Sequence, residues 1–167
     1  ENTPTAPASL HGLTHASREM FLREAYNGPM ISLRPSLLYG YADPHNGYGP
    51  NKFQRLAEKG ETITLFGEGE EKRDHVFIED VAELAYLTII HRTKGVLNIA
   101  TGKSTSFREV AEMAIKIHNS ASSVQGTERQ NPITHRHFNV DNVIKCFPSF
   151  SYTNLRDGLT KVIHNKR

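Results

Sequence analysis

Two histidines stand four residues apart in the segment HGLTH, residues 11–15, at the start of a predicted helix. Side chains at this spacing share one face of a helix, so the pair could hold a metal ion or exchange protons near neutral pH. The zinc-protease motif requires a glutamate at position 12, which is Gly12 here, and a third ligand. His75, His135 and His137 qualify as that ligand only by residue type. In a chain with nine histidines such spacing is common, so solvated or hydrogen-bonded histidines are the favoured interpretation over a metal site.

Arg73 is a second candidate, in the segment GEGEEKRD, residues 67–74. An arginine fork matches two phosphate oxygens, although the same residue could be a surface charge. A dinucleotide-binding fold needs a glycine-rich turn between a strand and a helix. Gly67 and Gly69 lack the third glycine and the following helix, so the segment is predicted to be a hairpin turn between two strands. The chain therefore shows no dinucleotide-binding fingerprint.

Composition restricts the class of protein. The 167 residues are 37% hydrophobic and 23% charged, which is typical of one globular domain. The formal net charge of +2 suits a small anionic ligand, and no Lys/Arg run suggests nucleic acid. No apolar run has the length of a membrane span. The single cysteine, Cys146, excludes an internal disulfide and favours a reducing, cytoplasmic location.

The beginning of the chain resembles the interior of a longer protein. There is no initiator methionine, and Pro4 and Pro7 precede the first predicted element. We therefore expect a piece of a longer polypeptide.

The elements that must position these side chains follow from periodicity. Ser9 is a predicted N-cap, and Ser106 with Glu109 forms a capping-box pattern, as does Asp80 with Glu83. The predicted helices are 10–26, 51–59, one from residue 80, one from residue 107, 140–146 and 153–164. The predicted strands are 30–35, 62–67, 75–78, 95–100 and 134–140, with a long loop at 36–51. This alternation indicates an α/β protein.

Four segments together resemble one family. They are ENTPTAPASLHGLTH, RPSLLYGYADP, ITLFGEGEEKRDHVFIEDVAELAYL and GVLNIATGKSTSFREVAEM, in this order. They are similar to the C-terminal half of the extended short-chain dehydrogenases/reductases, the NAD-dependent nucleotide-sugar epimerase/dehydratase family. The resemblance covers nearly the whole chain.

The resemblance implies a fold and its divisions. It implies the C-terminal part of a Rossmann-type doubly wound fold plus a small α/β substrate-binding cap, with the N-terminal dinucleotide-binding half missing. Residues 1–167 would form a single partial domain. Residues 1–50 would end the Rossmann-like core, and residues 51–167 would be mostly the substrate-binding region with returning sheet elements.

The resemblance also bears on the two histidines. The family's Tyr-x-x-x-Lys pair removes a proton from a sugar hydroxyl while hydride passes to NAD or NADP, and the lysine lowers the tyrosine pKa. His11 stands at the tyrosine position and His15 at the lysine position. Histidine is shorter than either residue and mostly neutral at pH 7, so we expect the usual mechanism to be impaired or lost.

By the same resemblance, further residues acquire expected roles. The cofactor-binding positions are Pro35, Leu37 and Leu38. The substrate-binding positions are Tyr39, Phe53, Leu65, Phe66, Arg73 and Arg136. The two arginines would bind the diphosphate through charge-assisted hydrogen bonds.

The sequence thus predicts the substrate-binding half of a nucleotide-sugar epimerase/dehydratase, not catalytic as a separate chain. It would bind a nucleotide-diphosphate sugar and form a homodimer through residues 12–26 or pair with an N-terminal half. The alternatives are a non-catalytic nucleotide-sugar-binding or regulatory pseudoenzyme and, more distantly, a histidine-based metal-binding protein. The favoured interpretation includes no metal, nucleic acid or membrane.

Overall fold

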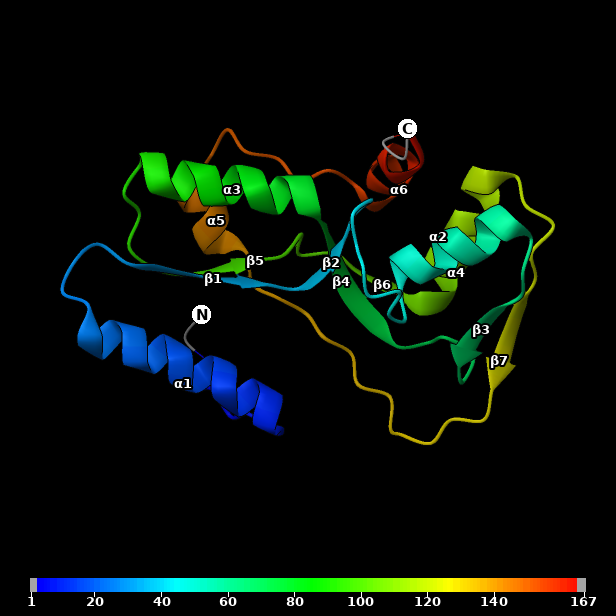
Figure 1. Ribbon diagram of the computed structural model, residues 1–167, viewed down its shortest axis with the longest axis horizontal. Coiled ribbons are helices and arrows are strands. Elements are labelled where there is room, and N and C mark those ends of the chain that lie inside the picture. Colours follow the sequence, from blue (N-terminus) through cyan, green and yellow to red (C-terminus); the bar gives the residue numbers. More distant parts are fainter. Residues whose placement is uncertain (1–2, 165–167) are drawn as a thin grey trace.

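Strand β4, Lys72–Phe77, lies between two lobes in the computed structural model, which describes residues 3–164 (Figure 1). The first lobe contains α1 (Leu10–Ala25), β1 (Ile31–Pro35), α3 (Ile78–Ile90), β5 (Gly95–Ile99) and α5 (Asp141–Cys146). The second contains α2 (Pro50–Lys59), β3 (Ile63–Phe66), α4 (Phe107–His118) and β7 (Val124–Thr127). Near β4 lie β2 (Leu37–Tyr39), β6 (Ser104–Ser106) and α6 (Leu155–His164).

Parallel pairing dominates the sheets. Strand β1 pairs with β5 in parallel, with Ile31 opposite Gly95, and β3 pairs with β7 in parallel, with Ile63 opposite Val124. Strand β4 is parallel to β2 and antiparallel to β6. Parallel strands joined through helices define the predicted α/β class, which is confirmed at this level.

Each lobe has its own apolar core. Helix α4 carries one, because its buried residues recur at helical spacing and face α2 and β3. The residues of this core are Phe53, Ala57, Ile63, Leu65, Phe107, Val110, Ala111 and Ala114. The core of the first lobe contains Val76, Leu84, Leu97, Ile99, Val143 and Phe147. A third cluster, Tyr39, Phe77, Leu159 and Val162, attaches α6 to β4 and β2.

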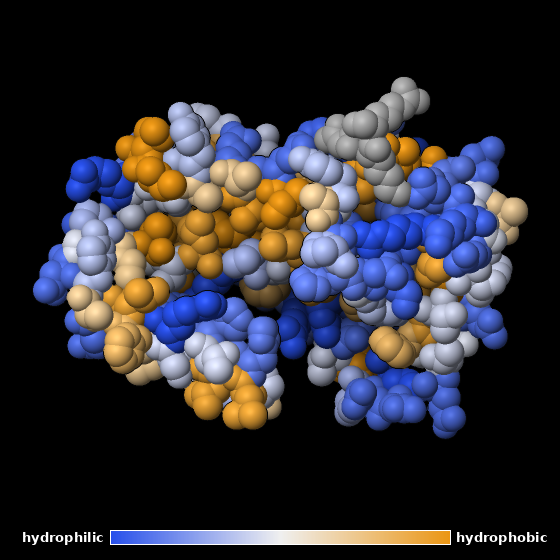
Figure 2. Space-filling model, viewed as in Figure 1, coloured by the Kyte–Doolittle hydropathy of each residue, from blue (hydrophilic) through white to orange (hydrophobic). Residues whose placement is uncertain are grey.

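Helix α1 differs from the others because none of its residues is buried. Ser9 caps it as predicted, accepting a hydrogen bond from the Gly12 N–H at 3.1 Å. Its apolar side chains are exposed, Leu10 by 82% and Phe21 by 76%, and Figure 2 shows hydrophobic surface over this helix. A fork from Arg34 Nε and Nη2 to Glu19, at 3.0 and 2.7 Å, ties α1 to β1.

Several sequence predictions of elements are confirmed and others are wrong. The capping box of Ser106 and Glu109 is present at the start of α4. The hairpin predicted around residues 67–74 is wrong, because β3 pairs with β7 and β4 with β2 and β6. The strand predicted at 134–140 is also absent from the described chain; this segment makes isolated contacts with β4, including Arg136 N–H to Lys72 O at 3.2 Å.

Asp80 does not cap α3, although its spacing to Glu83 predicts this. The helix begins two residues earlier, after Phe77, without a side-chain cap. The Asp80 carboxylate instead accepts hydrogen bonds from the N–H and hydroxyl of Thr153, at 2.9 and 2.8 Å. The Asp80 side chain, which the local pattern predicts to cap the helix, thus binds a residue that is distant in the sequence. Within residues 3–164, no helix has the length and apolarity needed to cross a membrane.

Candidate functional site

Arg73 lies at the beginning of β4, and its side chain is largely buried, with 13% exposed. Its guanidinium bonds the carbonyl of Lys72 at 2.9 Å, the carbonyl of Thr134, and the Thr134 hydroxyl at 3.2 Å. It also forms an ion pair with Glu71 at 2.7 Å. Arg73 therefore connects β4 to the segment around residue 134, which the sequence predicted as part of the same site.

The Glu71 carboxylate fills the anion position beside Arg73. Its Oε1 also accepts hydrogen bonds from the hydroxyl and N–H of Thr134, at 2.8 and 3.2 Å. Burial raises the pKa of Glu71, but the bonds from Thr134 and Arg73 outweigh this and lower the pKa below its ordinary value. Glu71 is thus a charged internal partner of Arg73 at neutral pH.

Arg136 lies next to Arg73 through backbone contacts. Its N–H donates to Lys72 O, and the Lys72 N–H donates to His135 Nδ1 at 3.2 Å. The Ser104 hydroxyl bonds the Arg136 carbonyl at 2.6 Å from the other side. The structure therefore places the two predicted diphosphate arginines on adjacent segments, with the side chain of Arg136 exposed.

A cavity of about 420 Å³ lies next to Glu71, the partner of Arg73. It is lined by Phe66, Glu71, Thr127, Glu128, Arg129, Gln130, Asn131 and Pro132. The Phe66 ring is 58% exposed and lies 4.6 Å, between centroids, from the ring of Tyr48. An exposed aromatic ring beside an arginine, here Arg129, is suited to stack on a flat, partly charged ligand.

Arg129 in this cavity was not among the sequence candidates. Its Nη2 donates to the Phe66 carbonyl at 2.9 Å and to Glu70 at 3.0 Å, and its buried Nε has no hydrogen-bond partner among the described residues. The available signal was weak: Arg129 follows β7, a short strand containing Gly126 that the sequence pattern does not reveal. Only the pairing of β7 with β3 brings this arginine to Phe66.

Three of the predicted substrate residues have fully buried side chains. Tyr39, Phe53 and Leu65 are 1%, 0% and 0% exposed and belong to the cores described above. In this conformation they can shape the cavity and offer backbone atoms, but their side chains do not reach its surface.

The predicted cofactor-binding residues lie at the carboxyl end of β1 and in β2. Pro35 is exposed, and Leu37 and Leu38 are 41% and 44% exposed. Ligands of open parallel sheets bind at this end of the strands. The three residues offer an apolar surface there.

His11 and His15 are exposed on α1, with ring centroids 4.5 Å apart and an interplanar angle of 73°. His15 Nδ1 is 2.8 Å from Arg18 Nη2. In the described part of the chain no three residues among His, Cys, Asp and Glu are grouped so that they could hold a metal ion. The structure thus does not bring His75, His135 or His137 to the pair as a third ligand.

Comparisons with known proteins agree with this architecture. The chain is 28% identical over 178 residues to a trifunctional UDP-glucose 4,6-dehydratase/UDP-4-keto-6-deoxy-D-glucose 3,5-epimerase/UDP-4-keto-L-rhamnose-reductase of Arabidopsis thaliana, covering 98% of this chain and 25% of the plant protein. It is 32% identical over 117 residues to a UDP-glucose 4-epimerase of Mycolicibacterium smegmatis, covering 66% of this chain and 37% of that protein. The chain therefore spans well under half the length of these relatives.

The fold is also similar to that of a solved structure. The UDP-glucose 4-epimerase of Thermus thermophilus in complex with NAD superimposes with a TM-score of 0.85 at 25% identity, over 99% of this chain and 57% of that one. The family described as "NAD dependent epimerase/dehydratase family" matches residues 1–100. This match covers more than half of the sequence and includes α1, β1 and β4. The chain therefore belongs to the NAD-dependent epimerase/dehydratase family.

Proposed function

We propose that this chain is the substrate-binding, C-terminal part of a nucleotide-sugar epimerase/dehydratase and that it binds a nucleoside-diphosphate sugar. One observation carries the proposal: Arg73 and Arg136 lie on adjacent segments, and Arg73 is paired with Glu71, which lines the 420 Å³ cavity that contains Phe66 and Arg129. The arginines would bind the diphosphate and the Phe66 ring would lie against the base. The UDP-sugar activities of the relatives support this ligand class.

Calorimetry with UDP-, dTDP- and GDP-sugars tests the proposal. We expect at least one class to bind, and Arg73→Ala to weaken binding by about 2–3 kcal/mol because a charge-assisted hydrogen bond is lost. Lys59→Ala, which removes an exposed cation at the end of α2, is the matched control and should leave the affinity unchanged. Absence of heat with all three classes would refute the proposal.

The described residues of this chain fit only part of an NAD or NADP molecule. Pro35, Leu37 and Leu38 would suit the flat face of a nicotinamide, but the described chain has no glycine-rich turn leading from a strand into a helix to hold a pyrophosphate. The Gly67–Gly69 turn connects two strands instead. We derive no reaction step through NAD or NADP in this chain.

We further propose that the separate chain has no epimerase or dehydratase activity. His11 and His15, at the expected tyrosine and lysine positions, face each other edge to plane. Neither supplies a phenolate or a permanent positive charge. A mixture of the chain, NAD⁺ and a bound sugar nucleotide should show no nicotinamide reduction by absorbance. Binding without turnover would equally suit a regulatory pseudoenzyme, the second candidate.

We propose that α1 forms the contact with a second copy or with an N-terminal half, in the cytoplasm. Exposed apolar side chains on this helix support the contact, since surfaces of this kind favour association. Light scattering across a concentration series tests it. A monomer at all concentrations would leave only the separate N-terminal half as a partner.

A further inference from the structure

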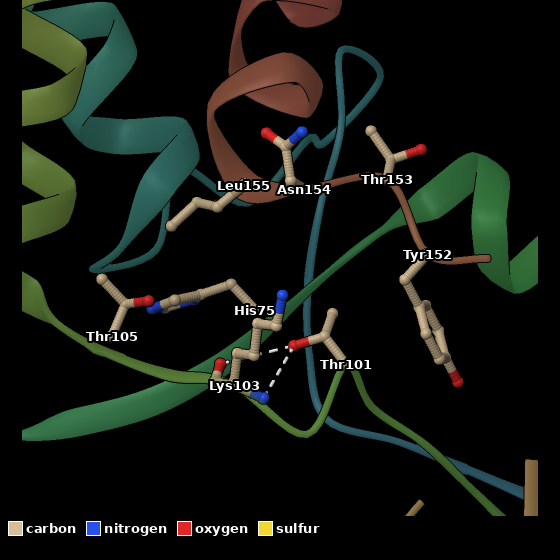
Figure 3. A pocket seen from close by; sticks show the side chains of 8 residues that line it. All are labelled: His75, Thr101, Lys103, Thr105, Tyr152, Thr153, Asn154 and Leu155. Atoms are coloured by element: carbon tan, nitrogen blue, oxygen red, sulfur yellow. Dashed lines mark hydrogen bonds between the residues drawn. The ribbon is translucent and has the colours of Figure 1, made fainter. Parts of the chain in front are cut away.

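A second cavity, of about 140 Å³, lies among β4, the loop that follows β5 and the start of α6 (Figure 3). Its lining consists of His75, Thr101, Lys103, Thr105, Tyr152, Thr153, Asn154 and Leu155. None of the residues assigned above to the nucleotide sugar or the cofactor lines it. It is therefore separate from the proposed nucleotide-sugar cavity.

His75 is the unusual residue of this cavity. It is 4% exposed, yet neither Nδ1 nor Nε2 has a hydrogen-bond partner among the described residues. Buried polar atoms in folded proteins nearly always have a partner, so an unpartnered imidazole facing a cavity indicates that something absent from the protein chain completes it. One face of the ring packs against Phe107, with centroids 5.7 Å apart. Burial, aided by the charge of Arg73, lowers the pKa of His75 to about 4, so the ring is neutral and offers one donor and one acceptor.

Positive and donor groups surround this imidazole. Figure 3 shows Lys103 rising from its loop toward the start of α6, and Thr105 beside the His75 ring. The loop is fixed because Thr101 Oγ1 accepts the Lys103 N–H at 3.1 Å. A lysine ammonium with three donors is suited to an anion.

The start of α6 adds a second source of positive potential. The first turn of a helix leaves N–H groups without intrahelical acceptors, and aligned peptide dipoles favour an anion there. Asn154 Oδ1 accepts the Asp157 N–H at 3.0 Å, so one of these donors is capped. The N–H groups of Leu155 and Arg156 have no acceptor in the part of the chain that the structure describes.

Three carboxylates near the cavity are already bound by donors from its walls. Asp74 accepts bonds from the N–H and hydroxyl of Thr101, both at 2.9 Å, and from Gly102 N–H at 2.8 Å. Asp80 is bound by Thr153 as described above, and Asp157 by the Asn154 amide at 2.5 Å. These carboxylates hold the walls in place. They use neither His75, whose nitrogens have no partner among the described residues, nor the exposed Lys103.

We propose that this cavity binds a small oxyanion that carries a proton, such as hydrogenphosphate, between Lys103, His75 and the start of α6. Its charged oxygens would accept from Lys103, Thr105 and the first turn of α6. Its O–H would donate to the imidazole nitrogen of His75 that carries no proton. The anion would thereby connect β4, the loop at residues 101–103 and α6.

Residue-resolved NMR of the full chain tests the proposal, with inorganic phosphate titrated against chloride at constant ionic strength. We expect saturable shifts of the amides of Lys103 and Leu155 and of the His75 ring, all with one dissociation constant. Lys103→Met should raise that constant about tenfold, since it removes one charge-assisted bond. Lys94→Met, at the opposite end of β5, is the matched control and should not change it.

Other outcomes would overturn the proposal. Shifts that do not saturate would indicate a cavity filled only by water, and equal effects of the two lysine variants would indicate a general charge effect. An equal response to acetate would exclude the requirement for a proton-carrying anion. His75→Phe should abolish the response at Leu155 but not any phosphate response near Arg136, so failure of the nucleotide-sugar proposal would be seen separately. If that variant does not fold, the Lys103→Met comparison still decides.

Discussion

Arg73 Nη2 lies 2.7 Å from Glu71 Oε1, and both side chains are mostly shielded from water, 13% and 19% exposed. The arginine best placed to bind a diphosphate is therefore already paired with an anion of the protein. A ligand must displace the carboxylate from Arg73 and Thr134 before it can use the same donors. The affinity of the ligand is set by the difference between the binding free energies of two anions, the ligand and Glu71, for the same donors.

Replacing Glu71 should therefore strengthen nucleotide binding. Glu71→Gln keeps the size of the side chain but removes the competing charge, so we expect UDP to bind roughly tenfold more tightly by calorimetry. Glu61→Gln, which neutralises an exposed glutamate near Lys59, serves as the control and should have no effect. Unchanged or weaker binding by Glu71→Gln would show that the carboxylate helps to orient Arg73 and does not compete.

The buried His75 should make stability depend on pH. Its folded pKa of about 4 is below the ordinary value of 6.5, so the unfolded chain takes up this proton first as the pH falls. The contribution of His75 to the free energy of unfolding is fully present above pH 6.5. It is lost as the pH decreases toward 4, by about 3 kcal/mol in total.

Urea unfolding at several pH values in phosphate-free buffer measures this effect. His75→Phe, which keeps an aromatic ring beside Phe107, should remove this part of the pH dependence whatever its stability at neutral pH. Parallel pH profiles of the two proteins would mean that the pKa of His75 does not differ between the folded and the unfolded state.

Gly158 in α6 should not tolerate a larger residue, because of Tyr39. A Cβ at position 158 would lie 2.0 Å from the Tyr39 hydroxyl and 2.8 Å from its Cζ. We expect Gly158→Ala to destabilise the fold by about 1–3 kcal/mol in thermal or urea unfolding. Gly47→Ala, where a Cβ meets nothing within 4 Å, is the control.

The same contact predicts a rescue. The Tyr39 hydroxyl is buried without a hydrogen-bond partner among the described residues, so Tyr39→Phe alone should cost little. In the double variant it should recover part of the loss caused by Gly158→Ala, because the 2.0 Å contact disappears while the 2.8 Å contact with Cζ remains, giving a measurable coupling energy. Additive effects would show that the clash is with another group.

Helix α1 should be held mainly by its ion pair. Since none of its residues is buried, the fork from Arg34 to Glu19 is its main described link to β1, and this bond is the first cause of the lowered pKa of Glu19. Glu19→Gln should accelerate amide hydrogen exchange across residues 10–25 roughly tenfold. Glu24→Gln on the same helix should have a much smaller effect. Equal exchange in both variants would mean that other contacts hold α1.

Local patterns predicted the elements that local physics decides. The helix at residues 10–25 and the capping box of Ser106 and Glu109 both follow from contacts within four residues. The short strands β2, β6 and β7 escaped prediction because three or four residues carry little periodicity and are fixed by distant partners. The supposed hairpin failed for the same reason: turn composition does not specify which strands pair.

The sequence pointed to some residues of the candidate site and missed others, for a related reason. Arg73 lies in a segment with a recognisable sequence, and the structure places that segment against the backbone of Arg136, while their diphosphate-binding role stays a prediction. Arg129 and the unpartnered His75 were not assigned to these cavities, since their surroundings come from β7 and α6, far along the chain. Burial also places Phe53 and Leu65 in the core, which a motif alone does not distinguish from a lining position.

The parallel pairs have a consequence for how the chain folds. Strand β1 must find β5, from Ile31 to Gly95, while β3 must find β7, from Ile63 to Val124. The chain segments closed by these two pairings overlap in sequence, because residues 63–95 belong to both. No single cut between residues 63 and 95 leaves a fragment with a complete sheet. Long-range closures of this kind slow folding, so the lobes should form together in one late, cooperative step and resist separation by truncation.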